Sequence, residues 1–236
     1  MKLINKTTDN KLMIGLTILL LLTVNYIASI FIKQYMTDIT AYDSIGFWLV
    51  ILNFTLMTLI VLGYKTYANW TWSDLGLEKS KNWWQPILML IGLYIAYTLF
   101  GRYIAPEIMK LGDRPDISHL MNIPVNFQGL IISLIMVWIT AAFLEELIFR
   151  GFLLNAINRL LGNTKWSLWT AVVISSVIFG VIHAYQGFTG ILLTGCIGFI
   201  FGVAFVINGR RLWPLILMHG IIDTISFISI YQMEPI

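Results

Sequence analysis

The chain has 236 residues, of which 58% are hydrophobic and only 11% are charged. Soluble domains are about 45–50% apolar and roughly 25% charged, so both values are typical of a polytopic membrane protein. The formal net charge of +3 indicates no nucleic-acid partner. The single cysteine, Cys196, excludes an intramolecular disulfide framework and a cysteine-rich metal site.

Seven hydrophobic runs follow one another along the chain, and each is near the length that a helix needs to cross ~30 Å of hydrocarbon. They cover residues 12–32, 46–63, 86–104, 127–149, 167–184, 188–207 and 212–231. The sequence therefore predicts an all-α, polytopic membrane protein of about seven transmembrane helices. We expect one integral membrane domain, in which residues 1–125 supply the first three helices with their loops and residues 126–236 supply the last four.

Lysine and arginine residues are unevenly divided between the two faces of this predicted bundle. Eleven lie at the N-terminus and around the loops after the second, fourth and sixth runs, against four on the other face. The positive-inside rule therefore predicts a cytoplasmic N-terminus and a C-terminus outside. Tryptophans at the span ends are expected to form an interfacial belt. They are Trp70, Trp72, Trp83, Trp84, Trp166 and Trp213.

Two adjacent carboxyls and a guanidinium interrupt the fourth run, in the stretch WITAAFLEELIFRGFLL at 138–154. A charge at the centre of a bilayer costs at least ~2.5–3.5 kcal/mol, so it needs a compensating partner. If the stretch is α-helical, Glu146 and Arg150 share a face, where pairing lowers the cost of both charges. Glu145 lies about 100° further round the helix, so it needs another partner or stays protonated. There are two alternatives to a catalytic role: the three residues form a structural cluster of ion pairs, or the motif ends the helix at the membrane interface.

Two further polar sites lie in predicted spans. Phe179 and His183 are four residues apart in the fifth run, and His219 and Asp223 have the same spacing in the seventh. Because each buried polar group is costly alone, a shared polar cavity inside the bundle is their least costly arrangement. Phe179 either lines that cavity or belongs to the core.

A helical hairpin would bring two of these residues to the same depth. If the fourth helix continues to Leu161, the short link that follows makes the fifth helix antiparallel to it. Glu145 and His183 then lie at similar heights. His219 shares that depth only if the segment AYQGFTG at 184–190 climbs as a loop, or if a helix is tilted or broken.

The residue types suit hydrolysis of an amide bond by either of two routes. Glu145 and His183 could bind and deprotonate a water, while His219 and Asp223 stabilise the oxyanion of the attacked carbonyl. Alternatively, Glu145, His183 and His219 could hold a zinc ion, because a carboxylate and two imidazoles form a known catalytic zinc set. The sequence has no HExxH motif, and both routes stay open: the cofactor is Zn²⁺ or there is none.

Three segments resemble the motifs of a known family. EELIFR, FGVIH and HGIID are similar to the EExxxR, FxxxH and HxxxN/D motifs of the CPBP intramembrane proteases, which include the CAAX prenyl proteases and the bacterial Abi bacteriocin-processing and self-immunity proteins. The resemblance covers residues 126–228, and WSDLGL at 72–77 is similar to a family feature upstream. It implies an all-helical fold and protease activity, with the metal requirement open.

The resemblance also implies roles for single residues. Glu145 would be the general base and His183 would share the activated water, while His219 and Asp223 would form the oxyanion or metal side. The supporting residues would be Glu146, Arg150 and Phe179. Asp223 departs from relatives that carry Asn at this position, because an ionised Asp cannot donate a hydrogen bond. That substitution puts the oxyanion role of this position in doubt.

The leading hypothesis is an intramembrane endopeptidase that cleaves a membrane-associated peptide or protein, with residues 126–236 as its catalytic core. Bacteriocins, signalling peptides, membrane regulators and prenylated chains are candidate substrates, and the lipid bilayer is the expected surrounding. A non-catalytic immunity or scaffold protein that binds a membrane partner is the alternative, and it predicts that Glu145→Ala keeps full activity. A transporter would need an alternating-access repeat, which the sequence does not show.

Overall fold

The computed structural model describes residues 10–35, 44–80, 82–117 and 127–232, and the regular secondary structure among these residues is all helical. Seven helical spans among them are long and apolar enough to cross a membrane, which confirms the predicted all-α membrane fold. The helices are α1 (Lys11–Gln34), α2 (Ile45–Tyr67), α3 (Trp84–Leu99), η2 (Phe100–Ile104), α4 (Ala105–Met109), α5 (Phe127–Val137), η4 (Trp138–Leu154), α6 (Asn155–Leu160), α7 (Lys165–Ile182), η5 (Ala184–Gln186), α8 (Gly187–Ile207) and α9 (Trp213–Tyr231). The third span joins α3, η2 and α4, and the fourth joins α5, η4 and α6.

Capping side chains set several helix starts. The Asn10 side chain accepts hydrogen bonds from the first backbone N–H groups of α1, and the Ser44 hydroxyl does the same for α2. Thr164 and Ser167 form a reciprocal capping box at the start of α7. A proline stands in the first turn of α9, where a backbone N–H would have no partner within the helix, so the missing N–H costs no helical hydrogen bond.

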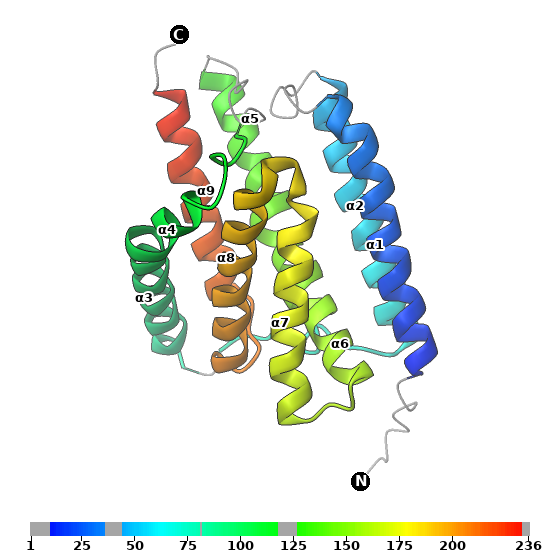
Figure 1. Cartoon of the computed structure of the whole chain (residues 1–236). Helices are drawn as coiled ribbons and strands as arrows, with labels where there is room; N and C mark the ends of the chain where they lie inside the picture. Colours follow the sequence, from blue (N-terminus) through cyan, green and yellow to red (C-terminus); the bar gives the residue numbers. More distant parts are fainter. Residues whose placement is uncertain (1–9, 36–43, 81, 118–126, 233–236) are drawn as a thin grey trace.

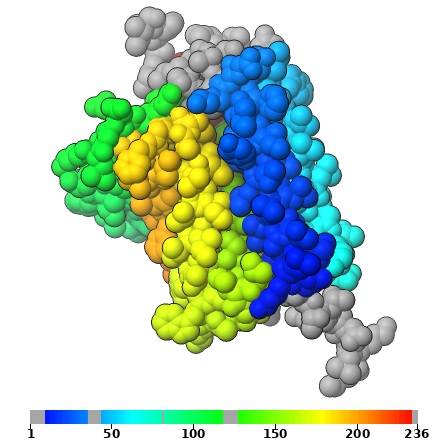
Figure 2. All heavy atoms as spheres, turned by 45° about the vertical axis from the view of Figure 1, so that its right-hand side comes forward, coloured from blue at the N-terminus to red at the C-terminus, as the bar shows by residue number. Residues whose placement is uncertain are grey.

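The helices form one bundle with α1 and α2 side by side at one edge and α3 at the other (Figure 1). Between these edges α7 packs along α8, while α9 packs against η4, α3 and α5. Figure 2 shows the outer face of α1 beside α6 and α7, so the first helix closes one side of the bundle. The central position of η4 lets it contact α2, α5, α7, α8 and α9.

The fourth span is continuous to Leu160 and turns directly into α7, as the predicted hairpin requires. The helix type differs from the expectation, because residues 138–154 form a π-helix rather than an α-helix. A π-helix bonds each residue to the fifth one along instead of the fourth, and such turns occur frequently at functional sites. Here the π-helical segment contains Glu145, Glu146 and Arg150.

The turn between α7 and α8 decides the depth of His183. Residues 184–186 form a 3-10 turn and α8 begins at Gly187, whose φ of 83° suits glycine, so the segment does not climb as a loop. In Figure 1 this turn lies lower than the neighbouring ends of α1, α2, α5 and α9. His183, the C-cap of α7, therefore sits below that end of the bundle.

Small residues let α7 and α8 approach closely. A Cβ atom at Gly180 would lie 2.5 Å from the carbonyl oxygen of Ile191 and 3.1 Å from the Cα of Gly195. Such close backbone contacts through glycine are typical of packed membrane helices. Gly180 is three residues before His183, so this contact holds the histidine against α8.

The loop after α2 ties three helices together at one end of the bundle. The Asp74 carboxylate pairs with Arg159 at 2.7 Å, and its backbone carbonyl accepts a hydrogen bond from the Asn155 amide at 3.2 Å. Leu212 donates its backbone N–H to the carbonyl of Gly76 at 2.9 Å. The segment WSDLGL therefore connects α6 with the start of α9.

Trp70, in the same loop, does not belong to the interfacial belt that the sequence predicts. Its side chain is 4% exposed, and the guanidinium of Arg159 lies 4.2 Å from its ring centroid. The other five tryptophans of the predicted belt are between 41% and 83% exposed. The prediction that Trp70 belongs to the interfacial belt is wrong, because a position at a span end does not show that the loop folds back onto the bundle.

Candidate active site

The Glu146–Arg150 pair lies in the interior of the bundle. The guanidinium Nη1 donates to Oε1 of Glu146 at 3.0 Å, and the two side chains are 4% and 0% exposed. The predicted pairing across one helical turn is therefore present, although the helix is of the π type. Two opposite charges at this depth offset part of each other's desolvation cost.

Aromatic rings and one carbonyl surround the rest of the Arg150 guanidinium. It lies 4.3 Å from the ring centroid of Phe179 and 5.4 Å from that of Phe201. Its Nη2 is 3.5 Å from the carbonyl oxygen of Gly198. Cation–π contacts of this kind are strongest when the cation is desolvated. Phe179 thus packs directly on the charged group.

His219 connects this pair to α9. Its Nδ1 lies 2.9 Å from Oε1 of Glu146, and its Nε2 lies 3.5 Å from Oδ2 of Asp223. The ring of Phe201 meets the His219 ring edge-on at 5.9 Å between centroids. Four of the predicted site residues, Arg150, Glu146, His219 and Asp223, therefore form one continuous chain of polar contacts.

The two carboxylate oxygens of Glu146 differ in their hydrogen bonding. Oε1 accepts from both Arg150 and His219, while Oε2 is buried with no hydrogen-bond partner among the described residues. A buried carboxylate oxygen without a partner is costly, so this atom marks a position where a further donor would be stabilising.

His183 has a defined orientation. Its Nδ1 lies 2.7 Å from the carbonyl oxygen of Phe179, and the ring lies 4.8 Å from the Phe179 ring and 5.7 Å from that of Tyr185. A carbonyl oxygen can only accept, so Nδ1 carries the proton in this hydrogen bond. When the imidazole is neutral, Nε2 is then the basic nitrogen.

Glu145 differs from its neighbour in exposure. Glu146 is fully buried, whereas Glu145 is only partly buried. Glu145 lies close enough to His219 and Asp223 to interact with their charges. The two glutamates therefore face different surroundings, as the sequence predicts for adjacent helical residues.

The structure adds two aromatic residues that the sequence analysis did not select. The hydroxyl of Tyr185 lies close enough to Glu145 and Asp223 to interact with their charges. The Trp138 ring packs where a Cβ at Gly220 would be, within 2.6 Å, and its Nε1 donates to Thr224 at 3.0 Å. Tyr185 could have been noticed because it follows His183 by two residues, but nothing in the sequence distinguishes Trp138 from interfacial tryptophans.

The predicted zinc set does not assemble in this structure. In the described part of the chain, no three His, Cys, Asp or Glu side chains are arranged to hold a metal ion. Both ring nitrogens of His219 already face carboxylates, and Nδ1 of His183 faces a backbone carbonyl. This arrangement of Glu145, His183 and His219 therefore does not fit zinc, and we derive no step through a metal.

Comparison with known proteins bears on the same segment. Residues 127–225 match the family described as "Type II CAAX prenyl endopeptidase Rce1-like". Through these residues, which are less than half of the chain, the protein is similar to the CPBP intramembrane proteases. The matched region contains every residue of the predicted site and includes η4, α7, α8 and most of α9. The seven apolar helical spans indicate an integral membrane protein, and the matched segment is similar to a family of membrane proteases.

Two similar proteins extend this result. A Bacillus subtilis (strain 168) protein named "Putative membrane peptidase YdiL" is 28% identical over 202 residues, which are 85% of this chain and 77% of that protein. An Escherichia coli protein named "Uncharacterized 24.3 kDa protein" is 26% identical over 124 residues, 52% of this chain and 55% of its own length. No solved structure matches this chain.

Proposed function

We propose that this protein is an intramembrane endopeptidase of the CPBP type that uses an activated water to hydrolyse a peptide bond of a membrane-associated peptide or protein. The observation that carries the proposal is the chain of contacts that runs from the buried Arg150–Glu146 pair through the partly buried His219 to Asp223. It joins two membrane-spanning helices beside a partly exposed second glutamate. Polar groups at this depth are costly, and a catalytic site accounts for all of them together.

The proposed reaction begins with a water between Glu145 and His183. Glu145 takes a proton from the water, and the basic Nε2 of His183 accepts a hydrogen bond from it. The water oxygen attacks the carbonyl carbon of the scissile bond. The proton on Glu145 then passes to the leaving amide nitrogen, so the C–N bond breaks to give a carboxylic acid and an amine.

His219 is proposed to stabilise the negative oxygen that forms during the attack. In the imidazolium form of His219, Nδ1–H donates to Glu146 and so orients the ring, while Nε2–H is directed toward Asp223. The Nε2 to Oδ2 distance of 3.5 Å is long for a hydrogen bond, so this N–H can be shared with the oxyanion. Asp223 acts by orienting His219, since a carboxylate cannot donate to the oxyanion itself.

Glu146 and Arg150 are proposed as positioning residues. Glu146 fixes the His219 ring, and Arg150 holds the Glu146 carboxylate while its guanidinium is packed between Phe179 and Phe201. In this view the first glutamate of the pair performs chemistry and the second organises the site. Their different exposures support that division.

We further propose residues 126–236 as the catalytic core and residues 1–125 as the helices that enclose it. The distribution of lysine and arginine supports a cytoplasmic N-terminus and an external C-terminus. Candidate substrates are bacteriocins, signalling peptides and membrane regulators, and the name of the matching family adds prenylated chains to them.

The test compares membrane-bound and released peptides from cells that express either the native chain or Glu145→Gln at equal level. Glu→Gln keeps the shape and removes the base. The matched control is Glu107→Gln, because the Glu107 side chain is 67% exposed and pairs only with Lys110 among the described residues. Fragments that disappear with Glu145→Gln and persist with Glu107→Gln are expected, and they identify the substrate. Identical profiles from all three chains would favour the non-catalytic scaffold.

A further inference from the structure

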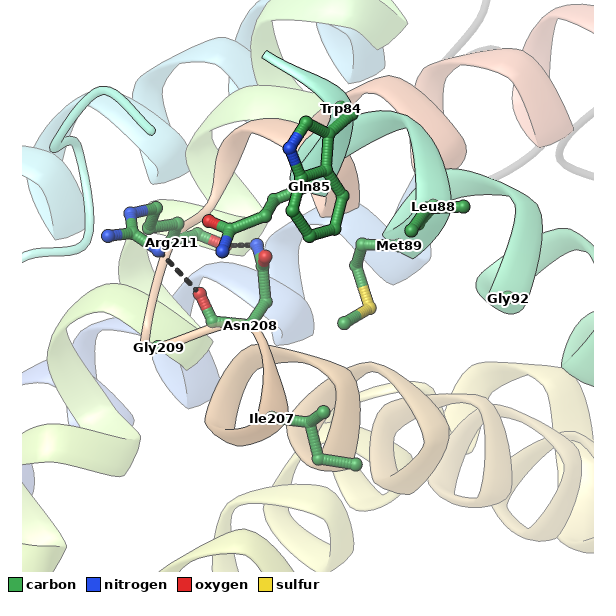
Figure 3. A pocket seen from close by; sticks show the side chains of 9 residues that line it. All are labelled: Trp84, Gln85, Leu88, Met89, Gly92, Ile207, Asn208, Gly209 and Arg211. Atoms are coloured by element: carbon green, nitrogen blue, oxygen red, sulfur yellow. Dashed lines mark hydrogen bonds between the residues drawn. The ribbon is translucent and has the colours of Figure 1, made fainter. Parts of the chain in front are cut away.

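A separate pocket of about 400 Å³ lies between the start of α3 and the end of α8, away from the glutamate pair (Figure 3). Its lining comes from two segments that are far apart in the sequence. The residues are Trp84, Gln85, Leu88, Met89, Gly92, Ile207, Asn208, Gly209 and Arg211. None of them belongs to the proposed catalytic machinery.

The outward side of the pocket, formed by α3 and the end of α8, is apolar and open. Leu88 and Ile207 are 57% and 67% exposed, so they face the surroundings of the bundle. A Cβ at Gly92 would meet no atom within 4 Å, which shows that the groove is not filled at that point. In a membrane-spanning bundle, an apolar groove on the outer surface is filled by lipid chains.

The other end of the pocket carries a fixed positive charge. Arg211 donates from Nη1 to the carbonyl oxygen of Asn208 at 3.3 Å, and the Asn208 amide donates to the carbonyl oxygen of Arg211 at 3.1 Å. Figure 3 shows these two residues and Gln85 at one end of the pocket, with Leu88 and Met89 toward the other. The turn therefore holds the guanidinium beside the apolar groove.

Glycine makes room for this arrangement. Gly209 has a φ of 66°, and a Cβ there would lie 3.2 Å from Nη1 of Arg211. The Nε of Arg211 is buried and has no hydrogen-bond partner among the described residues. The ion pairs of the described residues do not include Arg211. A partly buried guanidinium that has no anionic partner among the described residues can bind a phosphate or carboxylate.

We propose that this pocket binds one anionic phospholipid, with its phosphate on Arg211 and an acyl chain in the groove between α3 and α8. Trp84, which is 47% exposed at the first turn of α3, supports this placement because tryptophan favours the level of the lipid headgroups. The combination of an outward apolar groove with a charge at its end matches a lipid better than a peptide, whose backbone would leave polar groups unpaired in the groove.

The first experiment uses the full-length protein purified in detergent and native mass spectrometry. Equal amounts of dioleoyl phosphatidylglycerol and dioleoyl phosphatidylcholine compete for the protein. The native chain is expected to retain the anionic lipid about fivefold more than the zwitterionic one, as one arginine near a headgroup predicts. Equal retention of both lipids by the native chain would overturn the proposal without the use of any variant.

Three variants then locate the site. Arg211→Gln removes the charge and keeps an amide donor, so the preference for the anionic lipid should fall close to one. Gly92→Leu fills the groove without a backbone contact, so retention of the anionic lipid should fall while Arg211 is intact. Arg102→Gln, an exposed arginine in η2 at the opposite end of the third span, should leave the preference unchanged.

The outcomes separate a specific site from general attraction. An equal loss of preference in Arg211→Gln and Arg102→Gln would show that net charge alone attracts the lipid, and would overturn the proposal. Unchanged retention of the anionic lipid by Gly92→Leu would show that the acyl chain does not lie in the groove, and would also overturn the proposal. Circular dichroism of each variant verifies that its helices are intact.

Discussion

At the residue scale, the central feature is the Glu146 carboxylate, which forms hydrogen bonds with both Arg150 and His219. The spacing of Glu146 and Arg150 reveals their pairing in the sequence, because a separation of four residues places both on one helical face. The contact between Glu146 and His219 could not be predicted, since 73 residues separate them and the sequence does not say which glutamate faces α9. Packing of η4 against α9 decides that choice.

Loss of Arg150 should destabilise the protein strongly. Arg150→Leu leaves the fully buried Glu146 carboxylate with only His219 as a partner, and breaking a buried pair in this way costs ~3–5 kcal/mol. The control is Lys110→Leu, which breaks a similar pair whose side chains are 68% and 67% exposed, and should cost less than ~1 kcal/mol. Thermal unfolding in detergent measures both. A similar decrease in Tm for the two variants would contradict the buried role of Arg150.

The two nitrogens of His183 should prove separable. Asn at position 183 can imitate the Nδ1–H that donates to the Phe179 carbonyl, whereas it has no equivalent of Nε2. His183→Asn is therefore expected to unfold near the native temperature and to lose about 10²–10⁴-fold in turnover. The measurement combines thermal unfolding with release of the fragments that the native chain produces and the Glu145→Gln chain does not. An active His183→Asn enzyme would remove Nε2 from the mechanism.

At the scale of the elements, seven helices could be predicted because each apolar run has membrane length, and the hairpin between α6 and α7 follows from its short link. The π-helical form of 138–154 could not be predicted, because the hydrogen-bond register depends on packing around η4 rather than on local residue preference. The fold of the loop at 70–77 was also hidden, since its contacts lie on distant helices.

Close packing of α7 on α8 should matter for the position of His183. Gly180→Ala places a methyl group 2.5 Å from the Ile191 carbonyl, so it forces the helices apart and should destabilise the protein by about 1–3 kcal/mol. Gly63→Ala in α2, where a Cβ meets no atom within 4 Å, is the matched control and should be neutral. Thermal unfolding and fragment release are measured together. Equal stability of both variants would show that α7 and α8 can separate freely.

At the scale of the whole molecule, the loop at 70–77 holds two parts of the proposed catalytic region in register, because it forms hydrogen bonds with both α6 and the start of α9. These helices continue into the spans that carry Glu146 and His219. Asp74 is the charged group of this loop. Burial raises the pKa of Asp74, but hydrogen bonds from Thr71 and the charge of Arg159 outweigh that effect and hold the pKa below its ordinary value of 3.8.

This pKa shift gives the stability of the bundle a defined pH dependence. A carboxyl whose pKa is lowered by folding contributes stability that is present above its ordinary pKa and lost as the pH falls through the lowered value. The native chain should therefore lose more stability than Asp74→Asn between about pH 5 and the acid limit of the detergent sample. Thermal unfolding across this range measures the difference. Parallel curves for the two chains would contradict the contribution of the Asp74–Arg159 pair.

The most direct test of the central claim uses the oxygen that hydrolysis adds to its product. Membranes with the native chain or Glu145→Gln are incubated in water enriched in ¹⁸O, and new peptide C-termini are examined by mass spectrometry. Water-dependent cleavage by the Glu145 site predicts fragments that carry ¹⁸O at the new C-terminus with the native chain and are missing with Glu145→Gln. The same labelled fragments at equal yield from both chains would contradict the proposal that Glu145 activates the water.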